Sequence, residues 1–420
     1  MSSRYSSLSR DRLAVLVPEL LLIGQLIDRS GMAWCIEAFG REGMQQVAIE
    51  EWTAASPIYT RRMQRALGYE GDDVVTIFKG LQLDIGAPPQ FMDFRYTVHD
   101  PWHGEFHLDH CGALMDVEPM GPDFVRGMCH DIEDPTFDAT AVATNAHARV
   151  RPVHRPPRMP ADRSPHCAWT VTIDESYPPV TESADCTALR FSAAARLALD
   201  PIDPAGVGLA DYSGPLLSDL DFSAFSHSAL VRMADEVCLQ MHLLVLGFRR
   251  AVARRVDATT ERAITRKQLV GISGVAAGRI RSALSIPASA EGALQVLLLH
   301  PLLNPAAYVD VEPGEVLVLR PSPAHADGAW ITLCGPDSVS PLHNRDDVVP
   351  KYIERSAMIG CVACTVMPNE RLTMSGTVPQ SSVNRVDAPT VTVFVTGESA
   401  SRRNVKVTSA GVALGLITST

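Results

Sequence analysis

The first part of the chain places hydrophobic residues at a helical period. Ser9 is a residue type that caps helix N-termini, and apolar side chains then recur every three or four residues. The first of these are Leu13, Leu16, Leu20, Ile23 and Ile27. Further amphipathic stretches follow, so the pattern predicts several helices over about residues 9–82.

The period changes to two after residue 90. Met92, Phe94, Tyr96 and Val98 alternate with polar residues, which is typical of a half-buried strand. A turn at 100–104 leads to a second strand at 105–111, and two more strand-like runs lie at 147–155 and 167–174. A helix expected from Pro122, interrupted at Pro135, separates the two pairs of strands. This order predicts a small antiparallel sheet covered on one face by helices.

The whole chain is therefore expected to have an α+β fold. We expect a catalytic domain of N-terminal helices and antiparallel sheet at 1–175, and a Pro-, Ser- and Asp-rich connecting region at 176–222. A helical block should follow at 223–303, with a C-terminal α+β unit at 304–420.

The composition is typical of a globular protein and argues against some classes of partner. The 420 residues are 46% hydrophobic and 20% charged, as in a globular protein, and the net charge of −11 argues against nucleic acid as a partner. No apolar run is long enough to predict a membrane span. Nine cysteines without a secretory signal predict reduced thiols and a cytoplasmic protein.

Histidines are concentrated in one region: eight of the 13 lie between residues 99 and 166. On the second strand, alternation places His103, Glu105, His107, Asp109 and Cys111 on one face. Phe106, Leu108 and His110 would then face the helices. Imidazole, carboxylate and thiol groups on one strip suit a chemical site, although a solvated sheet face has the same alternation.

Three cysteines in this region each have a histidine directly beside them in the sequence. They are Cys111, Cys129 and Cys167. A neighbouring imidazole favours the nucleophilic thiolate. The alternative is that Cys129 and Cys167 are small core residues, because each lies on the apolar face of its own helix or strand.

These motifs resemble the L-2-amino-thiazoline-4-carboxylic acid hydrolase-like family. The resemblance covers about residues 20–175 and rests on HLDHCGALMDVEP around Cys111, MCHDIED with Cys129 and Asp131, and SPHCAWTV with His166 and Cys167. It implies hydrolysis of a carbon–nitrogen or carbon–sulfur bond in a small ring. Ser-Pro before the last His-Cys pair and the long C-terminal part depart from the family pattern.

The leading hypothesis is therefore a small-molecule hydrolase with a Cys/His site. Cys111 or Cys167 would attack the substrate, His107 or His166 would transfer protons, and Asp131 would orient a histidine or the substrate. Arg151 and Arg155 could bind a substrate anion, or else offset the acidic residues of the preceding helix.

Two alternatives stay open at this point. One is a metal-dependent enzyme in which His103, Glu105, His107 and Cys111 hold Zn²⁺ or Fe²⁺. The other is a non-enzymatic ligand-binding or sensor protein. In each case the partner expected is a small molecule, with a homo-oligomer left open.

Overall fold

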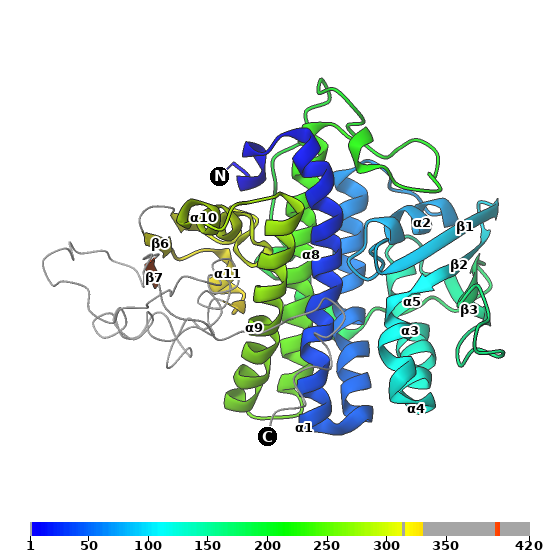
Figure 1. The fold of residues 1–420 in the computed structure, drawn as a ribbon. Helices are drawn as coiled ribbons and strands as arrows, with labels where there is room; N and C mark the ends of the chain where they lie inside the picture. Colours follow the sequence, from blue (N-terminus) through cyan, green and yellow to red (C-terminus); the bar gives the residue numbers. More distant parts are fainter. Residues whose placement is uncertain (1, 313–315, 331–390, 395–420) are drawn as a thin grey trace, which may run out of the picture.

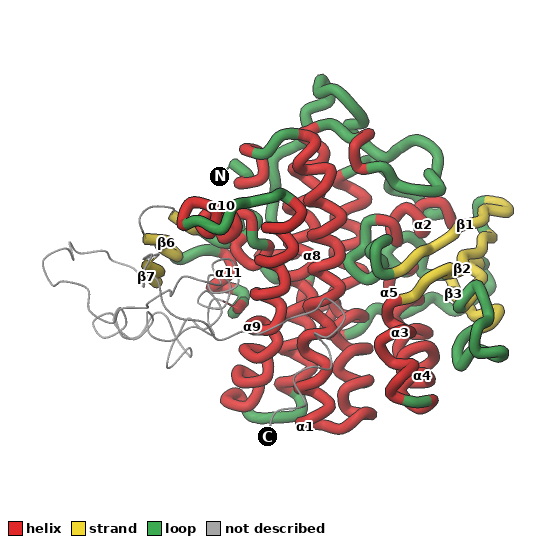
Figure 2. The backbone as a smooth tube through the Cα atoms, viewed as in Figure 1, coloured by secondary structure: helices red, strands yellow, loops and turns green. Residues whose placement is uncertain are grey.

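The computed structural model describes residues 2–312, 316–330 and 391–394 of the chain. Helices form most of this part, and a four-stranded antiparallel sheet lies along one side of them (Figure 2). The α+β fold class expected from the sequence is confirmed. Most of the C-terminal unit expected at 304–420 lies outside the described residues.

The longest helical segment, α1 (Arg10–Ala66), folds back on itself at Gly40. Gly40 has φ +72°, a left-handed conformation that glycine adopts without strain. The two halves lie side by side (Figure 1), and the Trp52 indole N–H of the second donates to Asp28 of the first at 3.3 Å. As expected, the Ser9 side chain caps the first turn. We call the two halves the α1 hairpin.

Two later helices complete a bundle with the α1 hairpin. α8 (His227–Ala253) and α9 (Ala258–Ala283) pack along it and share its hydrophobic core, and α10 (Ala290–Leu299) crosses at one end (Figure 1). Contact is close at Gly247 of α8, where an added Cβ atom would lie 2.9 Å from the Glu51 carbonyl oxygen. The N-terminal helices and the helical block expected at 223–303 thus share one core.

The main sheet has the order β1-β2-β4-β3. Its strands are β1 (Met92–Asp100), β2 (His103–Cys111), β3 (Ala148–His154) and β4 (Cys167–Ile173). α2 (Val74–Gln82) and α5 (Glu133–Ala141) cover one face through Phe78 and Phe137, whose rings contact Phe106. The opposite face, which carries His103, Glu105 and His107, is called the outer face below.

Helical segments connect β2 to β3, with a break at Gly121 and an unbroken run from Pro122 to Ala141. They contain α3 (Gly112–Val117), α4 (Pro122–Arg126), a π-helical turn (Gly127–Ile132) and α5. The expected interruption at Pro135 was wrong, because Pro135 lies in the first turn of α5, directly after the wider π-helical turn. Proline lacks an N–H group, and it is tolerated where no intrahelical donor is needed.

A β-bulge near the end of β2 changes which way its last residues point. Phe94 pairs with Leu108 but Met92 pairs with Cys111, so one residue of β1, Asp93, lies opposite two residues of β2. An extra residue reverses the alternation of side chains. His110 is therefore exposed and Cys111 is buried, and the sequence-based assignment of these two residues to faces was wrong.

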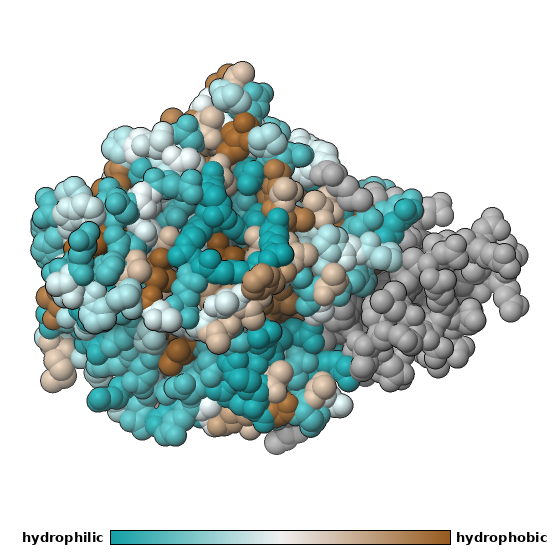
Figure 3. Space-filling model, turned by 180° about the vertical axis from the view of Figure 1, so that it is seen from behind, coloured by the Kyte–Doolittle hydropathy of each residue, from teal (hydrophilic) through white to brown (hydrophobic). Residues whose placement is uncertain are grey.

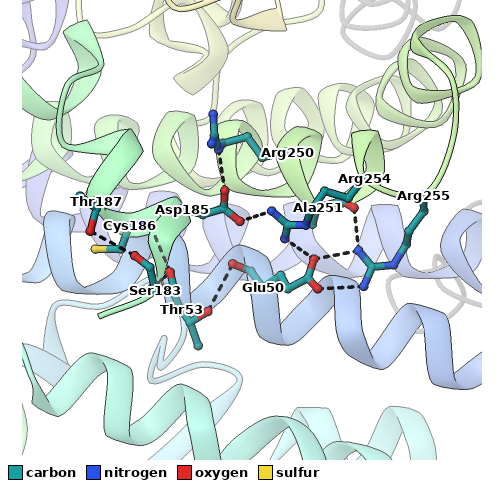
Figure 4. A network of polar contacts seen from close by, with 10 residues as sticks. All are labelled: Glu50, Thr53, Ser183, Asp185, Cys186, Thr187, Arg250, Ala251, Arg254 and Arg255. Atoms are coloured by element: carbon teal, nitrogen blue, oxygen red, sulfur yellow. Dashed lines mark hydrogen bonds and ion pairs between the residues drawn. The ribbon is translucent and has the colours of Figure 1, made fainter. Parts of the chain in front are cut away.

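The connecting region 176–222 is largely irregular and is held to the bundle by ion pairs. It contains α6 (Ala184–Leu189) and α7 (Ala193–Arg196). Asp185 accepts hydrogen bonds from Arg250 of α8, at 2.9 Å, and from Arg254, which directly follows α8 (Figure 4). Arg254 also contacts Glu50 of α1, so α1, α6 and α8 meet at one network of charges (Figure 4).

Short elements complete the described chain. A second antiparallel sheet has the order β5-β6-β7. Its strands and the remaining short helices are β5 (Val311–Glu312), β6 (Val316–Leu319), β7 (Val391–Phe394), α11 (Pro323–Ala326), and 3-10 turns at Arg4–Ser7, Glu118–Met120, Phe222–Ala224 and Pro301–Leu303.

The back of the molecule is mostly hydrophilic, with small and separate hydrophobic areas (Figure 3). Among the described helices, none combines the length and the apolar character that crossing a membrane requires.

The close contact at Gly247 gives a stability prediction. Gly247→Ala should lower the free energy of unfolding by about 1–3 kcal/mol, because the new methyl group meets backbone atoms of Glu51 that cannot move aside. Chemical denaturation monitored by circular dichroism measures this change.

Gly271→Ala in α9 is the matched control. Its added Cβ atom lies 3.4 Å from the Cβ atom of Ser30, an ordinary contact, so the better helix propensity of alanine should leave stability equal or raised by up to about 1 kcal/mol. Equal effects of the two substitutions would contradict the close packing of α8 on α1.

Candidate functional site

The three cysteines of the predicted site lie in one buried cluster. Cys111, Cys129 and Cys167 belong to the hydrophobic core between the sheet and its covering helices, together with Phe106 and Trp169. All three are free thiols. The Cys111 sulfur accepts a hydrogen bond at 3.4 Å from the Leu114 N–H and so caps α3. The sequence-predicted cysteines therefore do come together.

Their surroundings favour the neutral thiol. Burial, followed by the nearby Glu133 carboxyl, raises the pKa of Cys111 to about 12. The same two causes raise the pKa values of the Cys129 and Cys167 thiols well above the usual range. A cysteine attacks as the thiolate, so these positions are poor places for a nucleophile.

The histidines expected to assist them lie elsewhere. His107 is on the outer face, where its Nε2 atom is 3.4 Å from Asp109 Oδ1. His166 packs against the ring of exposed His110, and burial together with the nearby Arg158 charge lowers the pKa of His166. Asp131 is exposed. Within the described residues, no hydrogen bond joins any of the three thiols to a histidine.

The arginines proposed to bind substrate pair with acidic residues of α5. Arg151 donates to Asp138 at 2.9 Å and Arg155 pairs with Asp134. This is the arrangement that the second interpretation of these arginines expects. Arg155 also lies over the Trp169 ring, with its guanidinium carbon 5.8 Å from the ring centroid.

The four residues of the alternative metal site are divided between two faces of the sheet. His103 and Glu105 lie on the outer face, and His99 of β1 joins them there, with the ligand atoms of all three within 4.8 Å of one another. His107 pairs instead with Asp109, and the bulge turns Cys111 into the core. Cys111 cannot complete a metal site with the outer-face residues.

A cavity of about 120 Å³ lies between the α1 hairpin and α5, and we call it the α1 cavity. Its lining includes hydrophobic groups such as Met32, Met44 and Phe137. The charged and amide side chains that line it are Gln25, Asp28, Arg29, Asp84 and Glu133, and the lining also includes Trp52, Thr136 and Thr140. None of these residues was proposed as a site residue from the sequence, and Glu133 was counted only among the acidic residues of its helix.

Arg29 is the basic group of the α1 cavity. Its side chain is only 11% exposed, and the buried Nε and Nη2 atoms have no hydrogen-bond partner. The nearest carboxylate, Asp116, lies 3.7 Å from Nε, which is beyond hydrogen-bond distance. The buried Gln25 Oε1 atom, one helical turn earlier, also lacks a partner. Unsatisfied buried polar groups are costly and call for an explanation.

Glu133 of α5 also lines the α1 cavity, to which Gln25 and Arg29 contribute from α1. Burial raises the pKa of the Glu133 carboxyl to about 8, although the positive charges of Arg155 and Arg29 act in the other direction. Its Oε2 atom is buried and has no hydrogen-bond partner. At neutral pH this carboxyl is mainly protonated and is available as a hydrogen-bond or proton donor.

A second group of carboxyls lies on the bundle side of the α1 cavity. Asp28 accepts from Trp52, and Glu51 is fully buried beside it. Burial, followed by the nearby Asp28 carboxyl, raises the pKa of Glu51 well above its usual range. Burial also raises the pKa of Asp84 to about 6, although Asp84 accepts from Gly86 N–H at 2.7 Å and from the Tyr59 hydroxyl at 2.8 Å.

The sequence does contain a signal for this site. Gln25, Asp28 and Arg29 interrupt the apolar stretch of α1 at spacings of three and four residues, so they share one helix face. Taken alone, such a face is expected to point to water. Glu51 and Trp52 lie on the second half of α1, and only the turn at Gly40 places them next to Asp28.

Comparisons with known proteins do not identify the chain. No family model matches it, and neither the curated proteins nor the solved structures contain a significant match. The resemblance to the L-2-amino-thiazoline-4-carboxylic acid hydrolase-like family stays a prediction from the sequence motifs.

Proposed function

We propose that this protein is an enzyme that hydrolyses a carbon–nitrogen or carbon–sulfur bond of a small heterocycle bound in the α1 cavity. One observation carries the proposal: Gln25, Arg29 and Glu133 line one cavity, and each has a buried polar atom without a hydrogen-bond partner. Perturbed titratable groups and convergent polar atoms in a cavity mark a candidate active site. The choice of hydrolysis rests on the family resemblance.

The size and charge of the cavity support a small anionic ring compound. Its volume of about 120 Å³ is close to that of cavities that hold a benzene-sized molecule. A guanidinium group whose donor atoms lack hydrogen-bond partners pairs well with a carboxylate, so Arg29, which has Asp116 only at 3.7 Å, would bind the anionic group. Trp52 and the apolar side chains would contact the ring.

The carboxyls supply the proton transfers. The protonated Glu133 would donate its proton to the leaving nitrogen or sulfur as the ring bond breaks and its electron pair moves to that atom. Water adds to the ring carbon, and the Asp28 carboxylate, held by Trp52, takes a proton from it. Return of that proton through solvent to Glu133 restores both groups. Glu51, fully buried beside Asp28, would hold its own proton.

This mechanism replaces the cysteine nucleophile of the sequence hypothesis. The raised pKa values of the three thiols oppose thiolate formation, whereas a raised carboxyl pKa near neutrality suits a general acid. In this proposal the thiols help to form the apolar wall that keeps the Glu133 carboxyl protonated.

Glu133→Gln tests the role of the carboxyl. With 2-amino-thiazoline-4-carboxylate as the probe compound, we expect kcat to fall by roughly 100-fold or more, because glutamine donates a hydrogen bond but cannot transfer the proton. The wild-type rate should fall as pH rises above about 8, where Glu133 loses its proton. Product formation followed by NMR gives both results.

Asp131→Asn is the control, since Asp131 is exposed and only two residues away. It should keep turnover within about twofold. Loss of turnover in Asp131→Asn with full activity in Glu133→Gln would contradict the proposal. Binding of the probe without any product would favour the non-enzymatic alternative, and no binding of this or other small anionic heterocycles would contradict an α1-cavity site.

The cysteines give a separate prediction. Cys111→Ala, Cys129→Ala and Cys167→Ala, made singly, should each keep turnover within about threefold while lowering the free energy of unfolding by about 1 kcal/mol. Steady-state kinetics and denaturation measure the two effects. A loss of roughly 1,000-fold at one position, with the fold intact, would restore a thiol nucleophile.

A further inference from the structure

We propose that His99, His103 and Glu105 form a binding site for a divalent transition metal ion of the Zn²⁺ type on the outer face of the sheet. The site is separate from the α1 cavity and does not depend on the proposed hydrolysis. It differs from the ligand set expected from the sequence in two ways. His99 enters the set, and neither His107 nor Cys111 belongs to it.

The register of the β1–β2 hairpin brings the three side chains together. Val98 pairs with Gly104 and Asp100 pairs with His103, so His99 and Asp100 both lie opposite His103. This is a β-bulge in β1, and it makes His99 a cross-strand neighbour of His103. Glu105 follows His103 by two residues on the same strand face.

The distances suit a metal ion. His99 Nε2 lies 3.5 Å from Glu105 Oε1, and the rings of His99 and His103 have centroids 4.9 Å apart. All three ligand atoms lie within 4.8 Å of one another. Tetrahedral Zn²⁺ with bonds of about 2.0–2.2 Å needs ligand atoms about 3.3 Å apart, which small side-chain rotations would achieve. Two imidazoles and a carboxylate are a known zinc ligand set that leaves a position for water.

The backbone beneath these residues is fixed from several sides. The Pro101 carbonyl accepts from Val74 N–H at 2.9 Å, and the Trp102 carbonyl accepts from Ile173 N–H at 2.8 Å. At Gly104, between the two β2 ligands, an added Cβ atom would lie 2.8 Å from the Phe78 ring. The end of the hairpin is thus held against α2 and β4. A fixed backbone lowers the entropy lost when the side chains bind an ion.

His107 lies on the same outer face but is not part of the proposed metal site. Its imidazole is engaged by Asp109 at 3.4 Å, and it lies four residues beyond His103 along the strand. The His99 and Glu105 side chains are 40% and 47% exposed, so an ion can reach them directly from solvent. Because the covering helices lie on the other face, such an ion would hold β1 to β2 and take no part in α1-cavity chemistry.

Cobalt titration tests the site. The full chain, without an affinity tag and after removal of metals by EDTA, is titrated with Co²⁺ in parallel with His103→Asn, and binding is followed by calorimetry and visible absorption. Wild type should bind one more equivalent than the variant. Thiols elsewhere remain in both proteins, so their contribution cancels. Glu105→Gln should weaken the same binding by roughly 10-fold or more.

His107→Asn is the matched control, because it removes an outer-face histidine that is not in the proposed set. It should bind Co²⁺ as wild type does, within about twofold. The proposal is overturned if wild type and His103→Asn bind the same number of equivalents with the same affinity. It is also overturned if His107→Asn and His103→Asn lose binding equally, which would indicate an unspecific histidine-rich surface.

Discussion

The reversal of α1 at Gly40 is the constraint on which the rest of the structure depends. It lays two helices side by side, and α8 and α9 then pack on both of them. The reversal also brings Gln25, Asp28 and Arg29 of the first half and Trp52 of the second half to one cavity facing α5. Since buried polar groups need partners, this packing creates a cavity with unsatisfied donors and acceptors. A polar ligand satisfies such groups better than an apolar one.

Electrostatics in this cavity follow from the same packing. Glu133 lies where α5 meets the α1 hairpin, and burial there outweighs the effect of nearby arginines on its pKa. The three thiols lie in the hydrophobic core next to the sheet, and burial raises their pKa values in the same way. One apolar environment thus makes a carboxyl suitable for proton donation and makes the thiols unsuitable as nucleophiles.

The sequence predicts the elements better than it predicts the site. The N-terminal helices, the four strands and the helical block follow from hydrophobic period alone. Cys111, Cys129 and Cys167, the cysteines of the three motifs, lie in one buried cluster. The sheet faces on which His110 and Cys111 lie could not be predicted. A bulge depends on how β2 pairs with β1, and the sequence pattern of a single strand does not reveal it. The α1 cavity was missed because a polar helix face is read as solvated unless its tertiary partner is known.

The central claim is that Glu133 is a protonated carboxyl within a ligand cavity at neutral pH. An NMR titration of carboxyl carbon signals, with the Glu133 resonance assigned by its absence in Glu133→Gln, measures this directly. The account predicts a midpoint near 8 for Glu133. A midpoint close to that of an ordinary glutamate, about 4.3, would contradict it.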